Sequence, residues 1–538
     1  MNDNHPILLG IDLGTTYSAM AYIDEYGDAK IISNSDNERI TPSVVFFESP
    51  DNIIVGQNAK DETELTPEMV ISFVKREMGK HKSQVRIEQL SDDLYSMPKP
   101  YTFFGKTYAP ETISSIILKK LKNDAEKYFN GREINEAVIT VPAYFNEAEK
   151  KATQDAGVQA GFKVLQVISE PTAAAISYGL ETSRKNEKVF VFDLGGGTFD
   201  VTILDIIGHG DNKVMNIIDT DGDHHLGGKD WDDTIIQYAC DLYAQKYSDA
   251  PRNDLEGFAD LVIKAERMKK QLTEKEHARF NMNCNGNKLK VELTRAQFRD
   301  LAEDLMLNLE NTCELVLDRN GIKWSDIDTI LLVGGSTRMP MVREMLEHIA
   351  QREISDNLVQ PDECVALGAA MRAMMLKLGN KADTSLYSKE LLSKYHDGLT
   401  VNDILSKSIG IVAQRVDEGR KMAFIFNRQL HIPASKSQQF FTIVEGQTSV
   451  KLSVREGESK NPDNCRVLVE KDLVFNRPMP IQSPIEVTFS MDHSGLLNVK
   501  AIDLTDFREI EFEVERRDNM SKAEVQNATA LVSLLNVE

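Results

Sequence analysis

One glycine-rich turn occurs twice in this chain, each time directly after an apolar segment that ends in aspartate. The first copy lies in residues 7–18, ILLGIDLGTTYS, and the second in residues 189–204, VFVFDLGGGTFDVTIL. Glycine lets the backbone approach a ligand closely and direct its N–H groups at it, and threonine hydroxyls add donors. Carboxylates at the same place can hold Mg²⁺ directly or through its waters. Two such turns facing one another would grip a polyphosphate from both sides, which predicts a two-lobed nucleotide-binding protein.

The residues after each turn exclude two common kinds of nucleotide site. Residues 17–23 and 199–206 carry β-branched and apolar side chains in rough alternation, which predicts a strand after each turn. A dinucleotide-binding turn opens a helix instead, and no Gly-Lys-Ser/Thr follows the glycines as it does in a P-loop. A single turn of this kind is more often a tight hairpin without a ligand. The second copy, with three successive glycines, favours the phosphate-binding interpretation.

Composition narrows the class of protein. The 538 residues correspond to about three or four domains, and 62 basic against 84 acidic residues give a net charge of −22. That balance argues against a nucleic-acid binder, which needs a basic surface to replace phosphate counterions. The five cysteines lie far apart without a CxxC pair, so neither a disulfide scaffold nor a zinc site is indicated. The N-terminus lacks a signal-peptide pattern and no apolar run approaches a membrane span, so we expect a cytoplasmic protein without membrane partners.

The pattern of hydrophobic residues changes along the chain. Residues 1–376 alternate strand-like and helical segments, which predicts an α/β domain. Residues 377–405 are polar and are the best candidate for a linker, whereas residues 406–518 form short strand-like runs separated by turns such as 493–495. Strands at this spacing are typical of a compact antiparallel sandwich.

The last segment, residues 519–538, predicts a helix. Ser521 and Glu524 have the spacing of a capping box, and apolar residues then recur on one face. We expect this apolar stripe to pack on the sandwich, with a helix that binds a partner protein as the less favoured alternative.

The chain resembles the DnaK-type family of seventy-kilodalton heat-shock chaperones almost from end to end. The motifs that carry this resemblance occur in the family's order: IDLGTT, VPAYFN, SEPTAAA, FDLGGGTFD, HLGGKD, LVGGSTRMP and QPDECVALGAA. The resemblance implies a two-lobed, actin/hexokinase-like ATPase domain, followed by an all-β peptide-binding sandwich and a short C-terminal helix that begins a truncated lid. It implies an ATP-dependent chaperone of the stress response that binds extended apolar segments of unfolded polypeptides, with peptide affinity controlled by ATP binding and hydrolysis.

The same resemblance assigns roles in nucleotide binding. The catalytic group consists of the six residues Asp12, Lys75, Glu170, Asp193, Thr198 and Asp200, and the three carboxylates Asp12, Glu170 and Asp193 would organise Mg²⁺. Lys75 would reach the γ-phosphate and Asp200 would orient the attacking water. The remaining contacts to ATP or ADP come from glycines, hydroxyls and charged side chains, namely Gly14, Thr15, Thr16, Tyr17, Gly195, Gly196, Gly197, Gly227, Gly228, Glu266, Lys269, Lys270, Thr273, Gly334, Gly335, Ser336, Arg338 and Asp362. The resemblance implies that the residues on the adenosine side are Glu266, Lys269, Lys270, Thr273 and Arg338.

Two further groups of residues follow from the resemblance. The positions that match the family's peptide groove are Ile411, Ala413, Phe440, Ile443 and Val450. The positions that match its interdomain coupling residues are Pro142, Lys150, Leu399, Val401 and Asp403. Apolar residues of a sandwich are core more often than binding surface, so the groove assignment rests on the resemblance alone.

Several departures from the family pattern keep alternatives open. The linker sequence at residues 399–403 is less apolar than usual, Lys150 replaces an arginine, and one helix stands where a long lid is expected, as in the HscC type. A J-domain co-chaperone is implied, whereas a short segment at 279–291 leaves the nucleotide-exchange factor open. The alternative to a cycling chaperone is a holdase or co-chaperone that binds ATP but hydrolyses little. A small-molecule kinase is a third possibility, disfavoured by the β domain.

Overall fold

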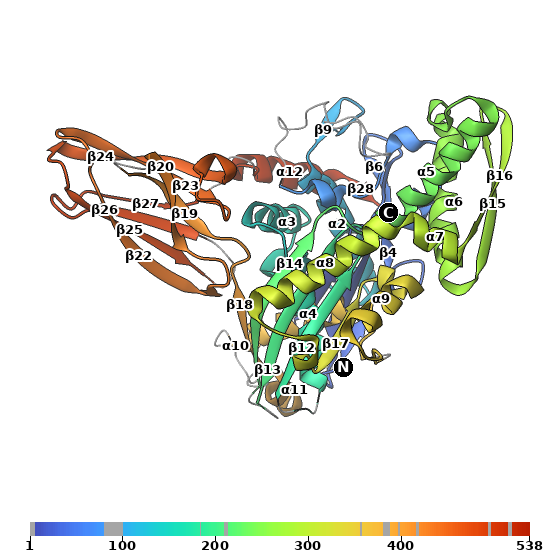
Figure 1. Cartoon of the computed structure of the whole chain (residues 1–538), viewed down its shortest axis with the longest axis horizontal. Coiled ribbons are helices and arrows are strands. Elements are labelled where there is room, and N and C mark those ends of the chain that lie inside the picture. The colour runs from blue at the N-terminus through green and yellow to red at the C-terminus, as the bar shows by residue number, and fades with distance from the viewer. Residues whose placement is uncertain are drawn as a thin grey trace.

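The computed structural model describes residues 6–79, 101–182, 184, 186–208, 213–355, 358–379, 388–395, 399–415, 419–492, 497–514 and 519–538. The expected turn at 493–495, the first five residues and parts of the expected linker lie outside these ranges. An α/β body carries a separate β domain at one side, shown in orange and red in Figure 1. Within the described residues, no helix has both the length and the apolar character that crossing a bilayer requires.

The first lobe of the α/β body, lobe I, is built on a sheet that contains the first turn. Its strands run in the order β11-β10-β1-β2-β3, with the bounds β1 Leu8–Asp12, β2 Tyr17–Ile23, β3 Ala29–Ile31, β10 Glu136–Val141 and β11 Lys163–Ser169. The helices packed on it are α2 (Pro110–Tyr128), α3 (Glu147–Gln159) and α10 (Cys364–Gly379). Asn146 and Glu149 form a capping box at the start of α3, while Pro110 begins α2, where a missing N–H costs nothing.

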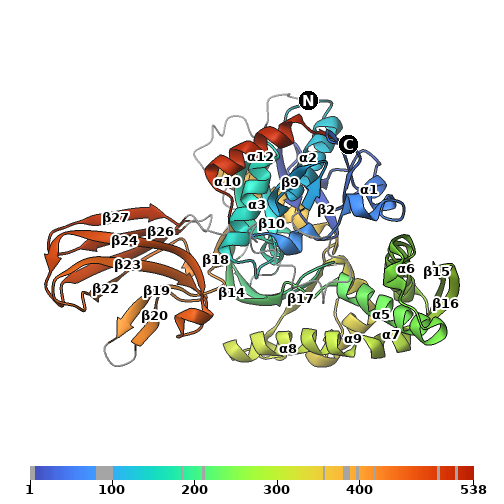
Figure 2. The same ribbon diagram turned by 90° about the horizontal axis from the view of Figure 1, so that it is seen from above.

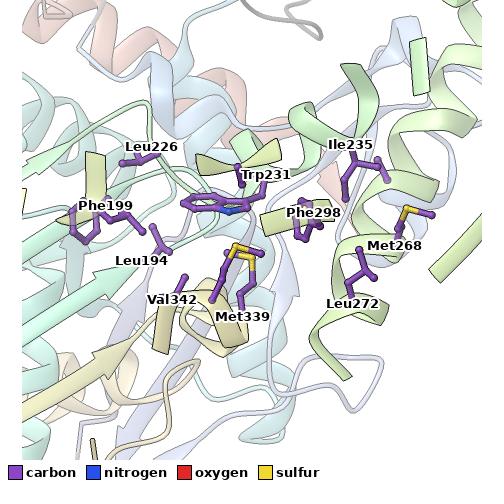
Figure 3. Packing of buried hydrophobic residues seen from close by; sticks show 14 of the residues in the cluster. Leu194, Phe199, Leu226, Trp231, Ile235, Met268, Leu272, Phe298, Met339 and Val342 are labelled. Carbon is purple, nitrogen blue, oxygen red and sulfur yellow. The ribbon is translucent and has the colours of Figure 1, made fainter. Parts of the chain in front are cut away.

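The second lobe, lobe II, has a sheet of the same kind that contains the second turn. Its strand order is β17-β12-β13-β14-β18-β21, with the bounds β12 Asn186–Leu194, β13 Phe199–Ile207, β14 Lys213–Asp223, β17 Thr329–Val333, β18 Leu399–Ile404 and β21 His431–Ile432. The helices of this lobe include α4 (Glu170–Glu181), α5 (Gly228–Tyr247), α6 (Leu255–Glu274), α8 (Glu303–Asn320) and α9 (Pro340–Ala350). Trp231 of α5 is fully buried in one apolar cluster with Leu194, Phe199 and Met339, so packing holds α5 beside the second turn (Figure 3).

Both glycine-rich turns are hairpin tips, as the sequence predicts. Asp12 pairs with Ala19 in the β1–β2 hairpin, and Leu194 pairs with Phe199 in the β12–β13 hairpin. The alternation of strands and helices that the sequence predicts for residues 1–376 is also present, for example in β10, β17 and α2. The two-lobed arrangement, the β domain and the C-terminal helix confirm the expected fold class.

Two crossings at the base of the lobes depend on glycine. A Cβ on Gly368 of α10 would lie 1.8 Å from the carbonyl oxygen of Ala173 in α4, and one on Gly10 would lie 1.9 Å from the amide nitrogen of Ala370. Real Cβ atoms never approach a backbone atom so closely, so α10 can pack against both α4 and β1 only because these side chains are absent.

Much of the expected polar linker is folded onto the α/β body. Helix α10 continues to Gly379, and α11 (Lys389–Tyr395) buries Tyr395, whose hydroxyl donates to the carbonyl of Gly27 at 2.8 Å. Strand β18 then joins the sheet of lobe II in parallel beside β14, from Lys213 opposite Leu399 to Asn216 opposite Asn402. The less apolar sequence of residues 399–403 therefore still forms a sheet strand, because backbone hydrogen bonds do not require apolar side chains.

The β domain consists of two antiparallel sheets around one apolar core. One sheet has the order β20-β19-β23-β24 and the other β22-β25-β26-β27, with the bounds β19 Ile409–Arg415, β20 Gly419–Phe426, β22 Ala434–Phe441, β23 Gln447–Glu456, β24 Arg466–Met479, β25 Pro484–Met491, β26 Leu497–Asp503 and β27 Glu509–Glu513. Strand β22 ends at Phe441, and residues 442–444 lie in a loop.

The prediction that the C-terminal helix packs on the sandwich is wrong. Helix α12 (Lys522–Leu534) has the expected capping box but lies on α3 and α2 of lobe I, as both views show (Figures 1 and 2). Val532 of this helix and Leu535, directly after its end, enter the core of lobe I. Helical periodicity identifies an apolar face but not its partner, and the face of α3 and α2 was available beside the β domain.

Candidate functional site

A cavity of about 520 Å³ lies between the lobes and is lined by both glycine-rich turns. Nearly all the expected nucleotide contacts line it, namely Asp12, Gly14, Thr15, Thr16, Tyr17, Lys75, Glu170, Asp193, Gly195, Gly196, Thr198, Glu266, Lys269, Lys270, Thr273, Gly334, Gly335, Ser336, Arg338 and Asp362. The four expected residues that do not line the cavity are Gly197, Asp200, Gly227 and Gly228. The structure therefore brings together, in one cavity, segments that are hundreds of residues apart.

The two turns touch one another at the bottom of the cavity. A Cβ on Gly196 would lie 2.0 Å from the hydroxyl of Thr16, and one on Gly197 would lie 2.3 Å from the methyl group of Thr15. The second turn is closed by the Gly195 N–H, which donates to the Thr198 carbonyl at 3.0 Å. Glycine is therefore required here for the contact between lobes, in addition to any contact with phosphate.

Four carboxylates gather around one buried lysine. Lys75 lies on a buried turn, Val74–Glu77, and donates a short hydrogen bond to Glu170. Burial and the nearby Glu170 raise the pKa of Asp12 to about 7 and that of Asp200 to about 8. Burial and the same carboxylates raise the pKa of Asp193 well above its ordinary value. The site thus has more negative charge than Lys75 can neutralise, which favours binding of a further cation.

The residues present fit Mg²⁺ that is held mainly by phosphate and water. Asp193 Oδ2 is buried and accepts no hydrogen bond from any described residue, so it is available to a cation. Asp12 lies on the opposite turn, where the Thr140 hydroxyl donates to its Oδ1 at 3.2 Å. Among the described residues, no group of three or more acidic, histidine or cysteine side chains is arranged to hold a metal ion alone. Mg²⁺ commonly uses one or two carboxylates together with substrate phosphates, which agrees with this arrangement.

Arg76 is a functional candidate that the sequence analysis missed. Its Nε donates to the carbonyl of Gly197 at 2.9 Å, and its guanidinium pairs with Asp230 at 2.6 Å. Asp230 also accepts from the Gly227 N–H at 2.7 Å. Arg76 therefore connects lobe I to the second turn and to the start of α5. Its only sequence signal is that it follows Lys75, and a charged residue at such a position is usually exposed.

A charged network closes the opposite end of the cavity. The Tyr17 hydroxyl and Glu266 of α6 both accept hydrogen bonds from Lys60, at 3.1 and 2.6 Å, and Lys270 contacts the same two groups. Burial opposes ionisation, but the ammonium groups of Lys60 and Lys270 outweigh it and lower the pKa of Glu266 to about 2. Lys60, on α1 (Gln57–Asp61), is a second residue that the sequence did not indicate. The network ties lobe I to lobe II across the adenosine side expected from the resemblance.

The remaining adenosine-side candidates are held by short polar contacts. Arg338 pairs with Asp362 at 2.6 Å, and the Ser336 hydroxyl donates to the Gly195 carbonyl at 2.9 Å. Lys269 donates to the Gly228 carbonyl at 2.7 Å and pairs with Asp232 at 2.8 Å. These contacts orient the segment after β17 and helix α6 toward the cavity.

The coupling candidates lie where the β domain meets the catalytic carboxylates. The Tyr144 N–H donates to Asp200 at 3.0 Å, and the ammonium group of Lys407, at the start of the β domain, lies 4.5 Å from the centre of the Tyr144 ring. The centre of the His224 ring lies 4.9 Å from the centre of the same Tyr144 ring. Pro142 begins the turn that contains Tyr144, because the Pro142 carbonyl accepts a hydrogen bond from the Phe145 N–H at 3.1 Å.

Lys150 is half-buried within the same interface. It pairs with Glu147 at 3.0 Å, and the charges of Glu147 and Asp403 raise its pKa although burial opposes this. Of the other expected coupling residues, Leu399 is buried and Val401 is half-buried in β18. The structure therefore places these candidates between the β domain and the nucleotide cavity.

The expected peptide-contacting residues do not share one environment. Ile411 is only 5% exposed and belongs to the core of the sandwich, whereas Ile443 is 45% exposed. Ala413, Phe440 and Val450 are half-buried. The apolar residues that are exposed near the end of β22 also include Phe441 and Val444, which the sequence analysis did not select. Most of β22 is exposed and its sequence does not alternate, so no pattern in the sequence separates the side chains that face outward from those that pack on the core.

Glu149 leads to a pH prediction. Burial raises the pKa of Glu149 to about 7. The N–H of Asn146 and the positive charges of Arg466 and Lys407 in the β domain act in the opposite direction but do not outweigh burial. Because the folded pKa is raised, the stability from this group is complete below its ordinary pKa of 4.5 and is lost as the pH rises through about 7. Between pH 5 and 8, ionisation of Glu149 should lower the free energy of unfolding by roughly 2 kcal/mol. The variant Glu149→Gln cannot ionise and should not show this fall. Thermal unfolding of wild type and Glu149→Gln across that range measures it, and parallel pH profiles would contradict it.

Comparison with known proteins agrees with this geometry. The family model described as Hsp70 protein matches residues 8–533. Proteins named Chaperone protein DnaK from Thermotoga petrophila (strain ATCC BAA-488 / DSM 13995 / JCM 10881 / RKU-1), Thermotoga maritima (strain ATCC 43589 / DSM 3109 / JCM 10099 / NBRC 100826 / MSB8) and Thermotoga neapolitana (strain ATCC 49049 / DSM 4359 / NBRC 107923 / NS-E) are each 38% identical to this chain. Each alignment covers 98% of this chain and 83% of the relative.

Proposed function

The chain belongs to the Hsp70 protein family and is an ATP-dependent chaperone with ATPase activity, and from that premise we propose how its residues divide the work. Proteins of this family bind ATP or ADP with Mg²⁺, and their partners are unfolded polypeptides and co-chaperones. The holdase and the small-molecule kinase are not favoured. We propose residues 1–376 as the ATPase domain, 377–405 as its connection, 406–518 as the peptide-binding domain and 519–538 as a separate C-terminal segment.

In the proposed division of labour, Lys75 neutralises charge that develops on the transferred phosphoryl group. Its ammonium group is held in place by Glu170 and is almost completely buried, so its position needs little reorganisation during the reaction. Asp200 lies behind the second turn, where the backbone N–H of Tyr144 fixes its carboxylate. From there Asp200 and the hydroxyl of Thr198 orient the attacking water.

Asp12 and Asp193, one from each turn, are the residues that would hold Mg²⁺, and Glu170 would lie in its outer coordination shell. When bound, the ion would neutralise negative charge on the phosphate groups. The observation that supports this role is the buried Asp193 Oδ2, which has no donor among the described residues. Arg76 is proposed as a positioning residue, because it holds the Gly197 carbonyl and so fixes the backbone of the second turn.

The route from nucleotide to peptide is proposed to run through β18. This strand pairs with β14, which in turn pairs with β13, where Asp200 lies opposite Gly222. A strand that enters the β domain is thus two strands away from the residue that orients water. Because both sites bias one sheet, a change in nucleotide would shift peptide affinity and the reverse would also hold. This adjacency is the single observation that carries the coupling proposal.

The peptide site is proposed at the exposed apolar residues at the end of β22, namely Phe441, the last residue of the strand, and Ile443 and Val444, which follow it. Main-chain hydrogen bonds would supply affinity and apolar pockets would select side chains. A J-domain co-chaperone and a cytoplasmic location are part of the same proposal. The likeness to the HscC type and the identity of any nucleotide-exchange factor stay predictions.

Steady-state ATP hydrolysis, with and without leucine-rich extended peptides, tests this function. We expect turnover that falls by at least tenfold in Thr198→Ala, since one donor at the reacting centre is lost. Peptide should change the turnover of the wild type. Turnover that ignores peptide would contradict the coupling, and ATP binding without hydrolysis would contradict the catalytic roles.

Arg428 provides a sharper test of the coupling. Its guanidinium donates to the Thr220 carbonyl of β14 and lies 3.3 Å from Asp219, which is fully buried. Removal of hydrogen bonds to charged groups costs about 1.5–3 kcal/mol each. We therefore expect Arg428→Ala to abolish most of the peptide effect on turnover while ATP affinity stays unchanged. Arg420→Ala, an exposed arginine of β20, is the matched control, and equal behaviour of the two variants would contradict the proposal.

A further inference from the structure

Phe73 directly precedes the turn Val74–Glu77, which carries Lys75. Its backbone is left-handed, with φ 59° and ψ 20°. That conformation is unfavourable for a bulky side chain and persists only where the surrounding structure determines it. The side chain of Phe73 is half-buried and lines the same cavity as Lys75. A strained aromatic residue therefore stands in the wall of the nucleotide cavity, next to the turn that carries the buried lysine.

The turn is held from behind by the core of lobe I. Val74 and Met78, at its two ends, are buried and belong to the same apolar cluster as the central strands of that lobe. The Arg76 N–H donates to the Phe73 carbonyl at 3.1 Å, so the left-handed residue is part of the hydrogen bonding of the turn. The position of the Phe73 side chain is therefore linked to the position of the whole turn.

On the other side of the cavity, Phe73 meets Lys229 of α5. The two lobes lie one above the other in Figure 2, lobe I with α2 and α3 and lobe II with α5 and α8. The Lys229 ammonium group lies over the Phe73 ring, 5.7 Å from its centre, which is within the range of a cation–π contact. Lys229 is only 6% exposed and pairs with Asp233 at 2.5 Å. Because a cation–π contact is stronger when it is shielded from water, this contact joins the lobes firmly.

Lys229 is also attached to the second glycine-rich turn. Its backbone N–H donates to the Gly196 carbonyl at 2.8 Å. The next carbonyl of the same turn, that of Gly197, accepts from Arg76 at 2.9 Å. The turn of lobe I that carries Lys75 thus reaches the second glycine-rich turn twice. Arg76 reaches it directly, and Phe73 reaches it through Lys229.

We infer that Phe73 is a positioning residue for ATP hydrolysis, which sets the Lys75 turn against α5 and the second glycine-rich turn. Arg76 fixes the end of the Lys75 turn, and the contact between Phe73 and Lys229 fixes its beginning. The inference rests on the proposed role of Lys75 at the transferred phosphoryl group. Because a misplacement of about 1 Å can slow a reaction as much as 10²-fold, loss of the ring should slow hydrolysis. The contacts on the adenosine side come from other elements and should hold ADP as before.

Single-turnover ATP hydrolysis by the whole chain tests this inference. Asparagine adopts positive φ more readily than most residues, so Phe73→Asn removes the ring and keeps the backbone conformation. We expect hydrolysis to be at least about fivefold slower in Phe73→Asn. Phe73→Tyr keeps the ring and should stay within about twofold of wild type, and neither variant should change the dissociation constant for ADP more than about threefold. A wild-type rate in Phe73→Asn, or equal slowing in Phe73→Tyr, would overturn the inference.

Phe104→Asn is the matched control. Phe104 is another phenylalanine of lobe I with positive φ, 49°, and lies between β8 (Tyr101–Phe103) and β9 (Lys106–Tyr108). Its side chain is 47% exposed and does not line the cavity. This variant should hydrolyse ATP at the wild-type rate. Slowing equal to that of Phe73→Asn would assign the effect to the general loss of an aromatic residue, against the inference.

Two lysine variants complete the test. If the ring acts through Lys229, then Phe73→Asn should slow Lys229→Met by less than about twofold, since contacting residues are not additive. Independent effects that multiply would speak against the contact. Lys75→Ala, measured beside them, separates this inference from the proposed function. Slow hydrolysis in Lys75→Ala with a wild-type rate in Phe73→Asn would overturn only the role of Phe73, whereas a wild-type rate in Lys75→Ala would contradict the proposed role of Lys75 itself.

Discussion

Replacement of Lys75 by alanine is expected to slow ATP hydrolysis by about 10²–10³-fold. Lys75 is the cation that lowers the pKa of Asp12, Asp193 and Asp200 in a site where burial and Glu170 raise them. Without it, Glu170 loses its partner and the phosphoryl group loses a fixed positive charge. Binding of ATP should weaken much less, because most contacts to the nucleotide come from the two turns and α6.

Single-turnover hydrolysis, together with the dissociation constant for ADP, separates the two effects. The matched control is Lys270→Ala, which removes a lysine from the same cavity at the adenosine end. That variant should weaken ADP binding and leave the hydrolysis rate of the bound nucleotide within threefold of wild type. If the two variants slow hydrolysis equally, Lys75 has no special place at the γ-phosphate.

Gly368→Ala is expected to have the largest effect on stability. Its new methyl group would lie 1.8 Å from the Ala173 carbonyl oxygen, which is a backbone atom of α4 and cannot rotate away. Helix α10 would have to separate from α4 and from β1, so buried contacts between both lobes would be lost. We expect a loss of about 3–5 kcal/mol, at the upper end of what single substitutions cause.

Thermal unfolding with and without ADP measures this loss, and Gly379→Ala is the control. Gly379 ends the same helix, and a Cβ there would meet no atom within 4 Å. Alanine at that position should leave the unfolding temperature unchanged or raise it slightly, because alanine has the higher helix propensity. A similar fall for both variants would show that helix propensity, and not the approach of α4, sets the requirement for glycine.

The nucleotide site could be predicted from the sequence to an unusual extent, because its chemistry is local. A strand, a glycine-rich turn and a second strand are consecutive in the chain, so residues such as Asp12 and Thr198 carry their own structural context. The resemblance then placed Lys75 and Glu170, which no periodicity indicates. Arg76 and Lys60 were missed because their partners, Gly197 and Glu266, are more than one hundred residues away.

The sequence by itself determined which segments form strands and helices, where the phosphate-binding turns lie, and that an α/β body precedes a β domain. These properties depend on neighbours along the chain, through backbone conformation and the period of apolar residues. Only the tertiary structure decided that α12 joins lobe I and that β18 joins the sheet of lobe II. An apolar stripe or an unpaired strand needs some partner, but its pattern does not say which one. That choice is made by shape and by which surface remains uncovered once the rest of the chain has folded.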